Sequence, residues 1–103
     1  EKFTMVDLYA DWCIACKELE KYTFSDQRVS RILKELNLVK YDITESTEGS
    51  GEFLSDYSLF GPPVILFFDD NGKEVKDARV VGFVDSDTFL EKLNKINYSS
   101  KNL

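Results

Sequence analysis

Cys13 and Cys16 are the only two cysteines in the 103-residue chain, and two residues separate them. They follow the apolar run of residues 5–10 and precede a stretch rich in helix-forming residues. Two thiols three positions apart at the start of a helix lie on adjoining turns, close enough to form a disulfide. A ring this small restrains an unfolded chain little, because cross-link stabilisation grows with loop size. The spacing therefore favours a pair that cycles between dithiol and disulfide over a structural cross-link.

The two cysteines are expected to have different roles because they occupy different positions on the predicted helix. Cys13 stands at the N-terminus, where the helix dipole and free backbone N–H groups favour a thiolate. We predict that Cys13 is the attacking thiol and the more exposed of the two. Cys16 lies one turn further along and is predicted to resolve the mixed disulfide. The alternative interpretation is two structural thiols or a bystander disulfide.

A carboxylate lies in the strand that leads to the cysteines. Asp7 stands among apolar neighbours, six positions before Cys13. Burial of an unpaired carboxylate is costly, and desolvation raises its pKa. We therefore hypothesise that Asp7 exchanges a proton with Cys16 when that thiol attacks or leaves. The alternative is a carboxylate at the solvated end of the strand.

Two charged residues follow on the same predicted helix. Glu20 comes four residues after Cys16, which places both on one helix face. The alternative for Glu20 is an exposed surface residue. Lys17 is either a solvated helix residue or a local positive charge that stabilises the thiolate.

The composition argues against several classes of function. The net charge of -6, from 13 basic and 19 acidic residues, disfavours nucleic acid as a partner. The chain has no histidine, which removes a Ser-His or Cys-His nucleophile and a His-ligated zinc or haem. Two cysteines supply half of a tetrahedral thiolate site, so no metal or other cofactor is expected within one chain.

The length and hydropathy indicate one domain. With 103 residues and 43% hydrophobic content, the chain is large enough to bury its own core. No window approaches the roughly eighteen apolar residues that a membrane span needs, and no signal peptide opens the chain. Since the chain starts at Glu1 and runs directly into a strand, we expect residues 1–103 to be a domain of a longer protein, with residues 97–103 as a frayed tail.

Hydrophobic periodicity and turn signals predict an α/β fold with the order β-α-β-α-β-β-α. The early strands are expected to pair in parallel, and the last two to form an antiparallel hairpin around residues 69–72. Residues 22–26 are predicted to interrupt the first helix, with Ser25 or Asp26 capping the next one. Strands are predicted at residues 3–10, 38–43, 64–68 and 79–83, and helices at 11–21, 26–36, 52–59 and from Asp85 or Ser86, with Phe24, Phe67, Phe68 and Phe89 in the core.

Three motifs together resemble the thioredoxin fold. They are Trp12-Cys13-Ile14-Ala15-Cys16-Lys17 after a strand, Gly61-Pro62-Pro63-Val64 before a core strand, and a late Gly82. This resemblance implies a central mixed four-stranded sheet with flanking helices. The strings at residues 9–18, 20–26 and 78–83 are more specifically similar to the C-terminal periplasmic domains of the DsbD family of bacterial thiol:disulfide interchange proteins.

The sequence also departs from ordinary thioredoxins. Ile14 and Ala15 stand between the cysteines where Gly-Pro is usual, and Tyr9 stands where a tryptophan is usual. The extra N-terminal strand and helix of the fold are missing from these residues. Pro62 before the expected cis proline is unusual, and it restricts the backbone of Gly61.

The family resemblance implies a protein-disulfide reductase that relays electrons. Such domains take electrons from the transmembrane domain of their own protein and pass them to its N-terminal periplasmic domain. From there the electrons reach disulfide isomerases and the cytochrome c maturation pathway. The resemblance thus implies a periplasmic domain of an inner-membrane protein, and we expect a monomer whose only redox group is the Cys13–Cys16 pair.

The resemblance also implies a set of contacts around the dithiol. Pro63 is expected to follow a cis peptide bond opposite the cysteines and to offer backbone hydrogen bonds to a substrate strand, the alternative being a plain helix breaker. Tyr9, Trp12 and Pro62 are expected substrate contacts, although aromatic side chains beside a strand end more often belong to the core.

The acidic pair is the last feature that the resemblance assigns to the site. It places Glu20 close to the dithiol together with Asp7. Two carboxylates near one thiol pair disfavour the thiolate and raise the cysteine pKa. We therefore expect Cys13 to stay largely a thiol until a partner docks.

Three other functions stay open on the sequence alone. The first is a free-standing thioredoxin-like reductase or oxidant, since the residues between the cysteines do not fix the reduction potential. The second is a binding module whose cysteines share a metal with a partner. The third is a structural thioredoxin-like domain in which the cysteines are dispensable.

Overall fold

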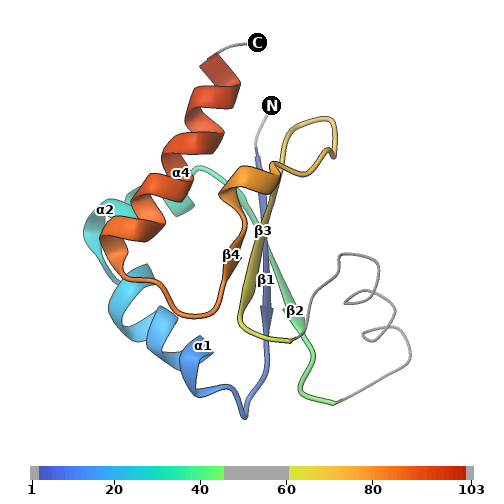
Figure 1. The fold of residues 1–103 in the computed structure, drawn as a ribbon, viewed down its shortest axis with the longest axis vertical. Coiled ribbons are helices and arrows are strands. Elements are labelled where there is room, and N and C mark those ends of the chain that lie inside the picture. The colour runs from blue at the N-terminus through green and yellow to red at the C-terminus, as the bar shows by residue number, and fades with distance from the viewer. Residues whose placement is uncertain (1–2, 46–60, 102–103) are drawn as a thin grey trace.

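The computed structural model describes residues 3–45 and 61–101. They form a four-stranded sheet in the order β2-β1-β3-β4, with the helices gathered against it (Figure 1). In chain order the elements are β1 (Thr4–Tyr9), α1 (Ile14–Glu18), the π-helix η1 (Leu19–Phe24), α2 (Gln27–Leu33), β2 (Asn37–Asp42), β3 (Val64–Phe68), the 3-10 helix η2 (Lys76–Ala78), β4 (Val80–Val81) and α4 (Ser86–Lys101). The helix predicted at residues 52–59 lies outside the described residues.

The sheet has the mixed topology that the sequence predicts. β1 pairs in parallel with β2, placing Asp7 opposite Lys40, and in antiparallel with β3, placing Leu8 opposite Val64. β3 and β4 are antiparallel neighbours. Since the carboxyl end of β1 leads to the cysteines and β3 runs the opposite way, the start of β3 lies at the cysteine end of the sheet.

The connection between β3 and β4 is longer than the predicted simple hairpin. The turn at residues 69–72 forms as expected, with the Asp69 carboxylate accepting hydrogen bonds from the backbone N–H groups of Asn71 and Lys73. Gly72 has a φ of 82°, a left-handed conformation that glycine adopts without steric cost. The chain then leaves the sheet for η2, so β4 covers only Val80–Val81 instead of residues 79–83. Gly82, with a φ of 81°, turns the backbone away directly afterwards.

The first helical region is more continuous than predicted. The chain does not break at Tyr22 but widens from the α-helix α1 into η1, which runs to Phe24. Leu19 and Thr23 are the buried residues of η1. The next helix begins as predicted, because the Asp26 side chain accepts a hydrogen bond from the backbone N–H of Arg28 and caps α2.

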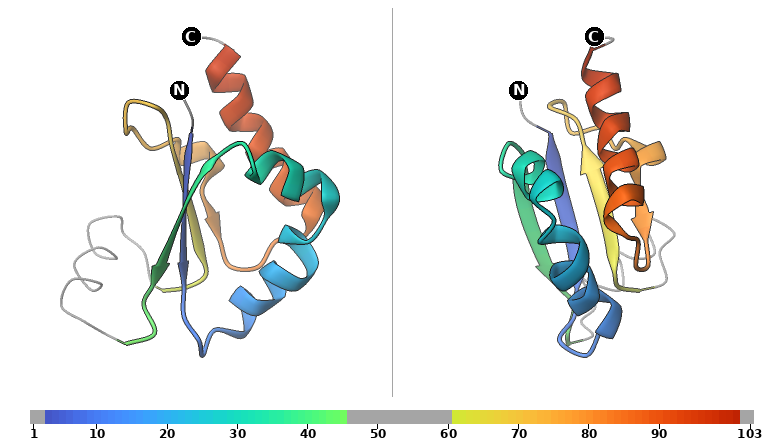
Figure 2. Two further views of the ribbon diagram at one scale, coloured as in Figure 1. Left: turned by 180° about the vertical axis from the view of Figure 1, so that it is seen from behind. Right: turned by 90° about the vertical axis from the view of Figure 1, so that its left-hand side faces the viewer.

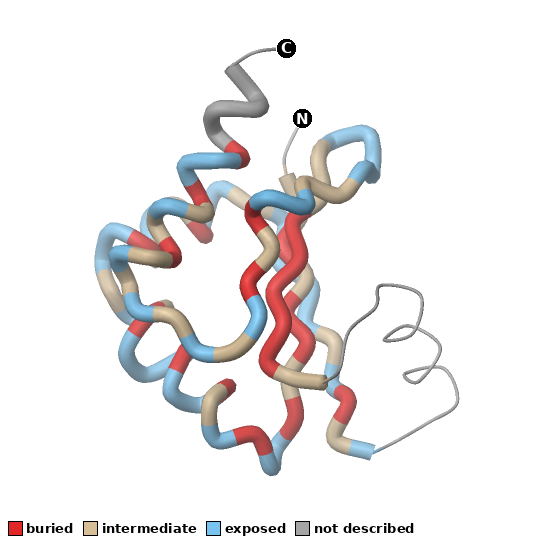
Figure 3. Tube along the Cα trace, viewed as in Figure 1, coloured by how far each residue is buried: buried red, intermediate tan, exposed pale blue. Residues whose placement is uncertain are grey.

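The helices α1, η1, α2 and α4 lie on one side of the sheet (Figures 1 and 2). The main core forms between them and the sheet, as the band of buried residues shows (Figure 3). Phe67 and Phe89 are fully buried there, whereas Phe24 packs against this core from a half-buried position. A second apolar cluster on the other face of the sheet contains the buried residues Leu8, Val64 and Leu66, with Phe68 half-buried against it.

The last helix starts at the predicted cap. The Asp85 carboxylate accepts a hydrogen bond from the backbone N–H of Thr88 at 2.9 Å. Phe89, Leu93 and Ile96 form its buried stripe. α4 extends to Lys101, into the segment predicted to fray. Within residues 3–45 and 61–101, no helix combines the length and apolarity that crossing a membrane requires.

Candidate active site

Cys13 and Cys16 are joined by a disulfide at the start of α1. Their Cα atoms are 5.3 Å apart, and Cys13 is the N-cap residue, whose Sγ accepts a hydrogen bond from the backbone N–H of Cys16 at 3.1 Å. The backbone N–H of Cys13 donates to the carbonyl of Ala10, which closes the turn after β1. The predicted pairing at a helix N-terminus is confirmed.

The expectation that Cys13 is the more exposed cysteine is wrong. Cys13 is 5% exposed and Cys16 is 7% exposed. The two belong to one small apolar cluster with Ala10 and Ile43, against which Tyr9 and Tyr41 also pack. Position in the helix therefore does not separate the two residues by exposure, because the turn after β1 and the end of β2 shield the first cysteine as well.

The turn before Cys13 is anchored to the end of β2. The hydroxyl of Thr44 accepts a hydrogen bond from the backbone N–H of Asp11 at 2.9 Å. Its backbone carbonyl accepts a second one from the Trp12 indole N–H at 3.1 Å. The hydroxyl of Thr44 in turn donates to the Asp42 carboxylate. These bonds hold Trp12 beside the disulfide while 62% of this residue stays exposed, which fits a contact surface and not a core position.

Pro63 follows a cis peptide bond, as predicted. It is buried directly before β3, at the cysteine end of the sheet. Its carbonyl accepts a hydrogen bond from the backbone N–H of Gly82 at 2.9 Å. Pro62, the residue before it, is half-buried.

A cavity of about 200 Å³ opens beside Cys16. It brings together Cys16 and the two carboxylates that were predicted to lie near the dithiol, Asp7 and Glu20. Its lining residues are Asp7, Tyr9, Ala10, Asp11, Cys16, Lys17, Glu20 and Lys40. Cys16 thus shares a solvent-sized space with several titratable side chains.

Asp7 is buried in this cavity, as the sequence predicts. Asp7 is 7% exposed, and burial raises its pKa from 3.8 to about 6. The positive charge of Lys40 lowers this pKa, and the negative charge of Glu20 raises it further. A carboxylate with a pKa near 6 takes up and releases a proton close to neutral pH. The geometry therefore suits Asp7 for proton exchange within the cavity.

Glu20 is near the site but exposed, which is the alternative that the sequence left open. Its carboxylate forms an ion pair with the ammonium of Lys40 at 3.1 Å, and more than half of each side chain is exposed. The ammonium also lies over the ring of Tyr9, 5.0 Å from its centroid. The hydrogen bond from Lys40 to Glu20 raises the pKa of Lys40, which keeps this side chain charged.

Lys40 and Thr44 are the residues that the sequence interpretation missed. Both belong to β2 or closely follow it, and neither lies near the cysteines in the sequence. The parallel register that sets Lys40 opposite Asp7 could have revealed the first, since an edge-strand lysine opposite a buried carboxylate is a charge partner. Nothing in the sequence marks Thr44. Among the described residues, no group of three or more Cys, Asp or Glu side chains could hold a metal ion.

Comparison with known proteins places this geometry in a family. A family model described as a thioredoxin-like domain matches residues 1–97. The chain therefore belongs to the thioredoxin-like family, as the motifs and the mixed four-stranded sheet indicated.

Relatives and solved structures narrow the similarity. The chain is 46% identical over 95 residues to the thiol:disulfide interchange protein DsbD of Actinobacillus pleuropneumoniae, and 49% identical over 92 residues to that of Yersinia pestis. These alignments cover 92% and 89% of the chain but only 16% of each relative. The oxidised C-terminal domain of Neisseria meningitidis DsbD superposes with a TM-score of 0.80 at 33% identity, over 91% of this chain and 79% of that domain. The reduced form of that domain gives a TM-score of 0.76. The chain is thus similar to the C-terminal domains of DsbD.

Proposed function

We propose that this chain is a protein-disulfide reductase that passes electrons by dithiol/disulfide exchange from a membrane-embedded domain to a periplasmic partner domain. The observation that carries the proposal is the Cys13–Cys16 disulfide at the start of α1, at the same end of the sheet as the cis Pro63. The similarity to the C-terminal domain of Neisseria meningitidis DsbD supports the same chemistry. We further propose that the transferred electrons serve disulfide isomerisation and cytochrome c maturation.

The exchange takes two steps. In the reduced chain, the Cys13 thiolate attacks one sulfur of the partner disulfide, which breaks that bond and releases one partner thiolate. The Cys16 thiolate then attacks Cys13 Sγ, forms the intramolecular disulfide and releases the second partner sulfur as a thiolate. Two electrons pass to the partner, one disulfide is formed and one is broken. The short distance between the cysteine Cα atoms, 5.3 Å, lets the second step occur within one helical turn.

Asp7 is proposed to take the proton from Cys16 in the second step. Both residues line the same cavity, and no other carboxylate named for the site is buried there. With a pKa of about 6, the Asp7 carboxyl group is mostly ionised at neutral pH and can accept a proton. Glu20 influences this group from a distance through its charge and through Lys40.

The proposed partner surface surrounds the disulfide. Trp12 is well exposed beside it, Tyr9 is half-exposed, and the Pro62-Pro63 pair lies at the start of β3. The backbone at Pro63 is proposed to pair with an extended partner segment. The partner is therefore a protein or a domain and not a nucleic acid, in keeping with the net charge of -6.

The setting of the chain is part of the proposal. The chain spans about one sixth of the relatives it matches, so we propose that it is one domain of a larger inner-membrane protein and faces the periplasm. Its electron donor is proposed to be the transmembrane domain of that protein, and its acceptor the N-terminal periplasmic domain.

A trapping experiment tests the function. The reduced Cys16→Ser variant should accumulate a mixed disulfide with a protein disulfide such as insulin, because the resolving thiol is absent. The matched Cys13→Ser variant should trap none. Equal trapping by both variants, or activity that survives both substitutions, would exclude the proposed exchange. A reduction potential against glutathione well above that of protein disulfide isomerase would reverse the direction and make the domain an oxidant.

A further inference from the structure

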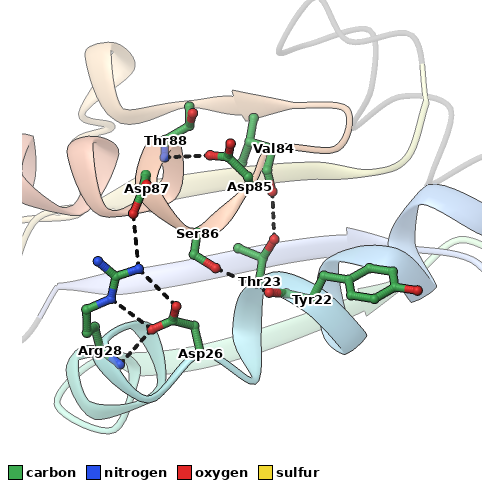
Figure 4. A network of polar contacts seen from close by, with 9 residues as sticks. All are labelled: Tyr22, Thr23, Asp26, Arg28, Val84, Asp85, Ser86, Asp87 and Thr88. Carbon is green, nitrogen blue, oxygen red and sulfur yellow. Dashed lines mark hydrogen bonds and ion pairs between the residues drawn. The ribbon is translucent and has the colours of Figure 1, made fainter.

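Thr23 is a fully buried polar residue that the two exchange steps do not use. It lies in the π-helix η1, and its hydroxyl donates a 2.6 Å hydrogen bond to the carbonyl of Val84, sixty-one positions along the chain. A threonine inside a helix usually satisfies its hydroxyl on a carbonyl of its own helix. Here the hydroxyl instead connects the helical region after the cysteines to the segment between β4 and α4 (Figure 4).

Other contacts between residues 22–28 and residues 84–87 lie at the surface. The Ser86 hydroxyl donates to the carbonyl of Tyr22 at 3.2 Å, and Arg28 forms ion pairs of 3.0 Å with both Asp26 and Asp87. Figure 4 shows these contacts beside the Thr23 bond. Exposed ion pairs contribute little to stability because solvent screens them. Among these contacts, the Thr23–Val84 bond is the one whose donor side chain is fully buried.

The segment 82–84 is fixed at both of its ends. At one end the backbone N–H of Gly82 donates to the carbonyl of the cis Pro63, and at the other the carbonyl of Val84 accepts from Thr23. Phe83 lies between the two anchors and is 42% exposed. In both Figures 1 and 2 this segment curves past α1, the helix that carries the disulfide.

Large apolar side chains are exposed at this end of the molecule. Phe83 and Val81 flank Gly82, Trp12 and Ile14 flank Cys13, and all four are exposed. Exposed apolar side chains that gather beside a reactive site are typical of a surface that a partner protein covers. The segment 82–84 supplies the part of this surface that touches Pro63.

We propose that Thr23 is a positioning residue for partner docking: its hydroxyl, presented by the widened turn of η1, fixes the Val84 carbonyl and thereby holds Phe83 beside Pro63. This inference rests on the proposed function, because it assigns the segment 82–84 to the partner surface of the exchange site. Thr23 does not touch the reacting sulfur atoms. Its removal therefore affects the binding of a protein disulfide and not the reactivity of the cysteines.

The test compares a protein disulfide with a small one. Reduced chain is mixed with increasing insulin or with hydroxyethyl disulfide, and oxidation of the dithiol in a single turnover is followed by acid quenching and thiol alkylation. Thr23→Val keeps the shape and removes the hydroxyl. We expect it to raise the half-saturating insulin concentration roughly 3- to 10-fold, the effect of one lost hydrogen bond, with the maximum rate and the hydroxyethyl disulfide rate unchanged.

Three further variants serve as controls. Thr23→Ser keeps the hydroxyl and should restore the half-saturating insulin concentration. Ser86→Ala removes the surface hydroxyl that bonds Tyr22 and Asp26 and should leave this concentration unaltered. Phe83→Ala should raise the half-saturating insulin concentration by itself. Combining it with Thr23→Val should add little, because both changes act on one segment. Phe83→Ala also tests the docking segment independently, even if Thr23→Val does not fold.

The outcomes separate this inference from the proposed function. Three results would overturn the positioning role and leave the exchange activity standing. They are an unchanged half-saturating insulin concentration in Thr23→Val, an equal loss with both disulfides, and additive effects of Thr23→Val and Phe83→Ala. An unchanged insulin value in Phe83→Ala would remove the segment 82–84 from the partner surface. A wild-type chain that oxidises with neither disulfide would overturn the proposed function and this inference with it.

Discussion

Met5 and Asp7 lie on the same face of β1, two positions apart, in opposite surroundings. Met5 is 4% exposed and packs in the main core between the sheet and the helices. Asp7 is about as well buried, at 7%, but it lines a cavity that it shares with Cys16, Glu20 and Lys40. Alternate residues of a strand point to one face, so a single strand reaches both regions.

The difference shows that burial stabilises the fold in the apolar region, whereas the burial of Asp7 costs stability, and under the proposed function that carboxylate serves the exchange reaction. In the main core, the burial of Phe67 and Phe89 supplies hydrophobic free energy. At the cysteine end, a carboxylate is held where its charge is disfavoured. A residue chosen for stability alone would be apolar at that position. Substitutions in the two regions should therefore change stability and activity in different ways.

The largest expected effect belongs to the main core. Phe67→Ala removes a fully buried aromatic ring from β3 and should lower the free energy of unfolding by about 3–5 kcal/mol, measured by urea denaturation. The neighbouring change Ile65→Val, which removes one methyl group, should cost only about 0.5–1.5 kcal/mol. A loss for Phe67→Ala no greater than that for Ile65→Val would contradict the assignment of the core.

Asp7→Asn should change the free energy of unfolding in the opposite direction and stabilise the chain. The folded pKa of Asp7 is about 6, above its ordinary value of 3.8, so the folded state retains a proton that the unfolded state has lost between these pH values. The free energy of unfolding of the wild-type chain therefore falls as the pH rises from about 4 to above 6. Asp7→Asn should remove this pH dependence and stabilise the oxidised chain at pH 8 by up to about 3 kcal/mol, measured by urea denaturation at several pH values.

The same variant should lose activity. Without this carboxylate, the second step of the exchange loses its buried proton acceptor, and the rate at neutral pH should fall roughly 100-fold. Single-turnover oxidation of the reduced chain measures this rate. If Asp7→Asn is more stable than the wild-type chain but is oxidised at the same rate, Asp7 has no part in the mechanism, although its burial is still unfavourable.

A smaller effect is expected at Lys40. Its positive charge lowers the pKa of Asp7, so Lys40→Gln should raise that pKa and move the pH profile of the exchange to higher pH. Lys40 is exposed, so the free energy of unfolding should change little. The measurement is the profile of single-turnover rate against pH. Lys34→Gln, which removes an exposed positive charge outside the cavity, is the matched control and should leave the profile in place.

The smallest effect is expected at Glu20. Its negative charge raises the pKa of Asp7 slightly, so Glu20→Gln should move the same pH profile in the other direction, to lower pH. The ion pair with Lys40 is exposed and its loss should change the free energy of unfolding by less than about 1 kcal/mol. Shifts of the same sign for Lys40→Gln and Glu20→Gln would show that neither charge acts on Asp7.

The sequence predicted those parts of the site that depend on local pattern. The disulfide at a helix start, the buried Asp7 and the Asp26 cap all follow from residue type and near neighbours, whereas the cis bond before Pro63 was expected from the family resemblance. Such features are specified within a few positions of the chain, where spacing and side-chain chemistry decide the conformation.

Features that depend on distant packing were missed. The ion pair of Lys40 with Glu20 requires the strand register, and the burial of Cys13 requires the end of β2 to cover it. The helix continues through Tyr22, and Thr23 satisfies its hydroxyl on the distant carbonyl of Val84, whereas the polar string at residues 22–26 resembled a break. No local pattern encodes a contact with a segment sixty-one positions away.

Trp12 is the only tryptophan of the chain, and Thr44 holds its indole ring next to the disulfide. The tryptophan fluorescence of the chain therefore originates from one fluorophore beside the group that changes oxidation state. Since disulfides quench nearby indole emission, reduction should brighten the domain, and occlusion by another protein should shift its emission to shorter wavelength. The molecule thus contains its own optical reporter, and neither a dye nor a tag is needed to follow it.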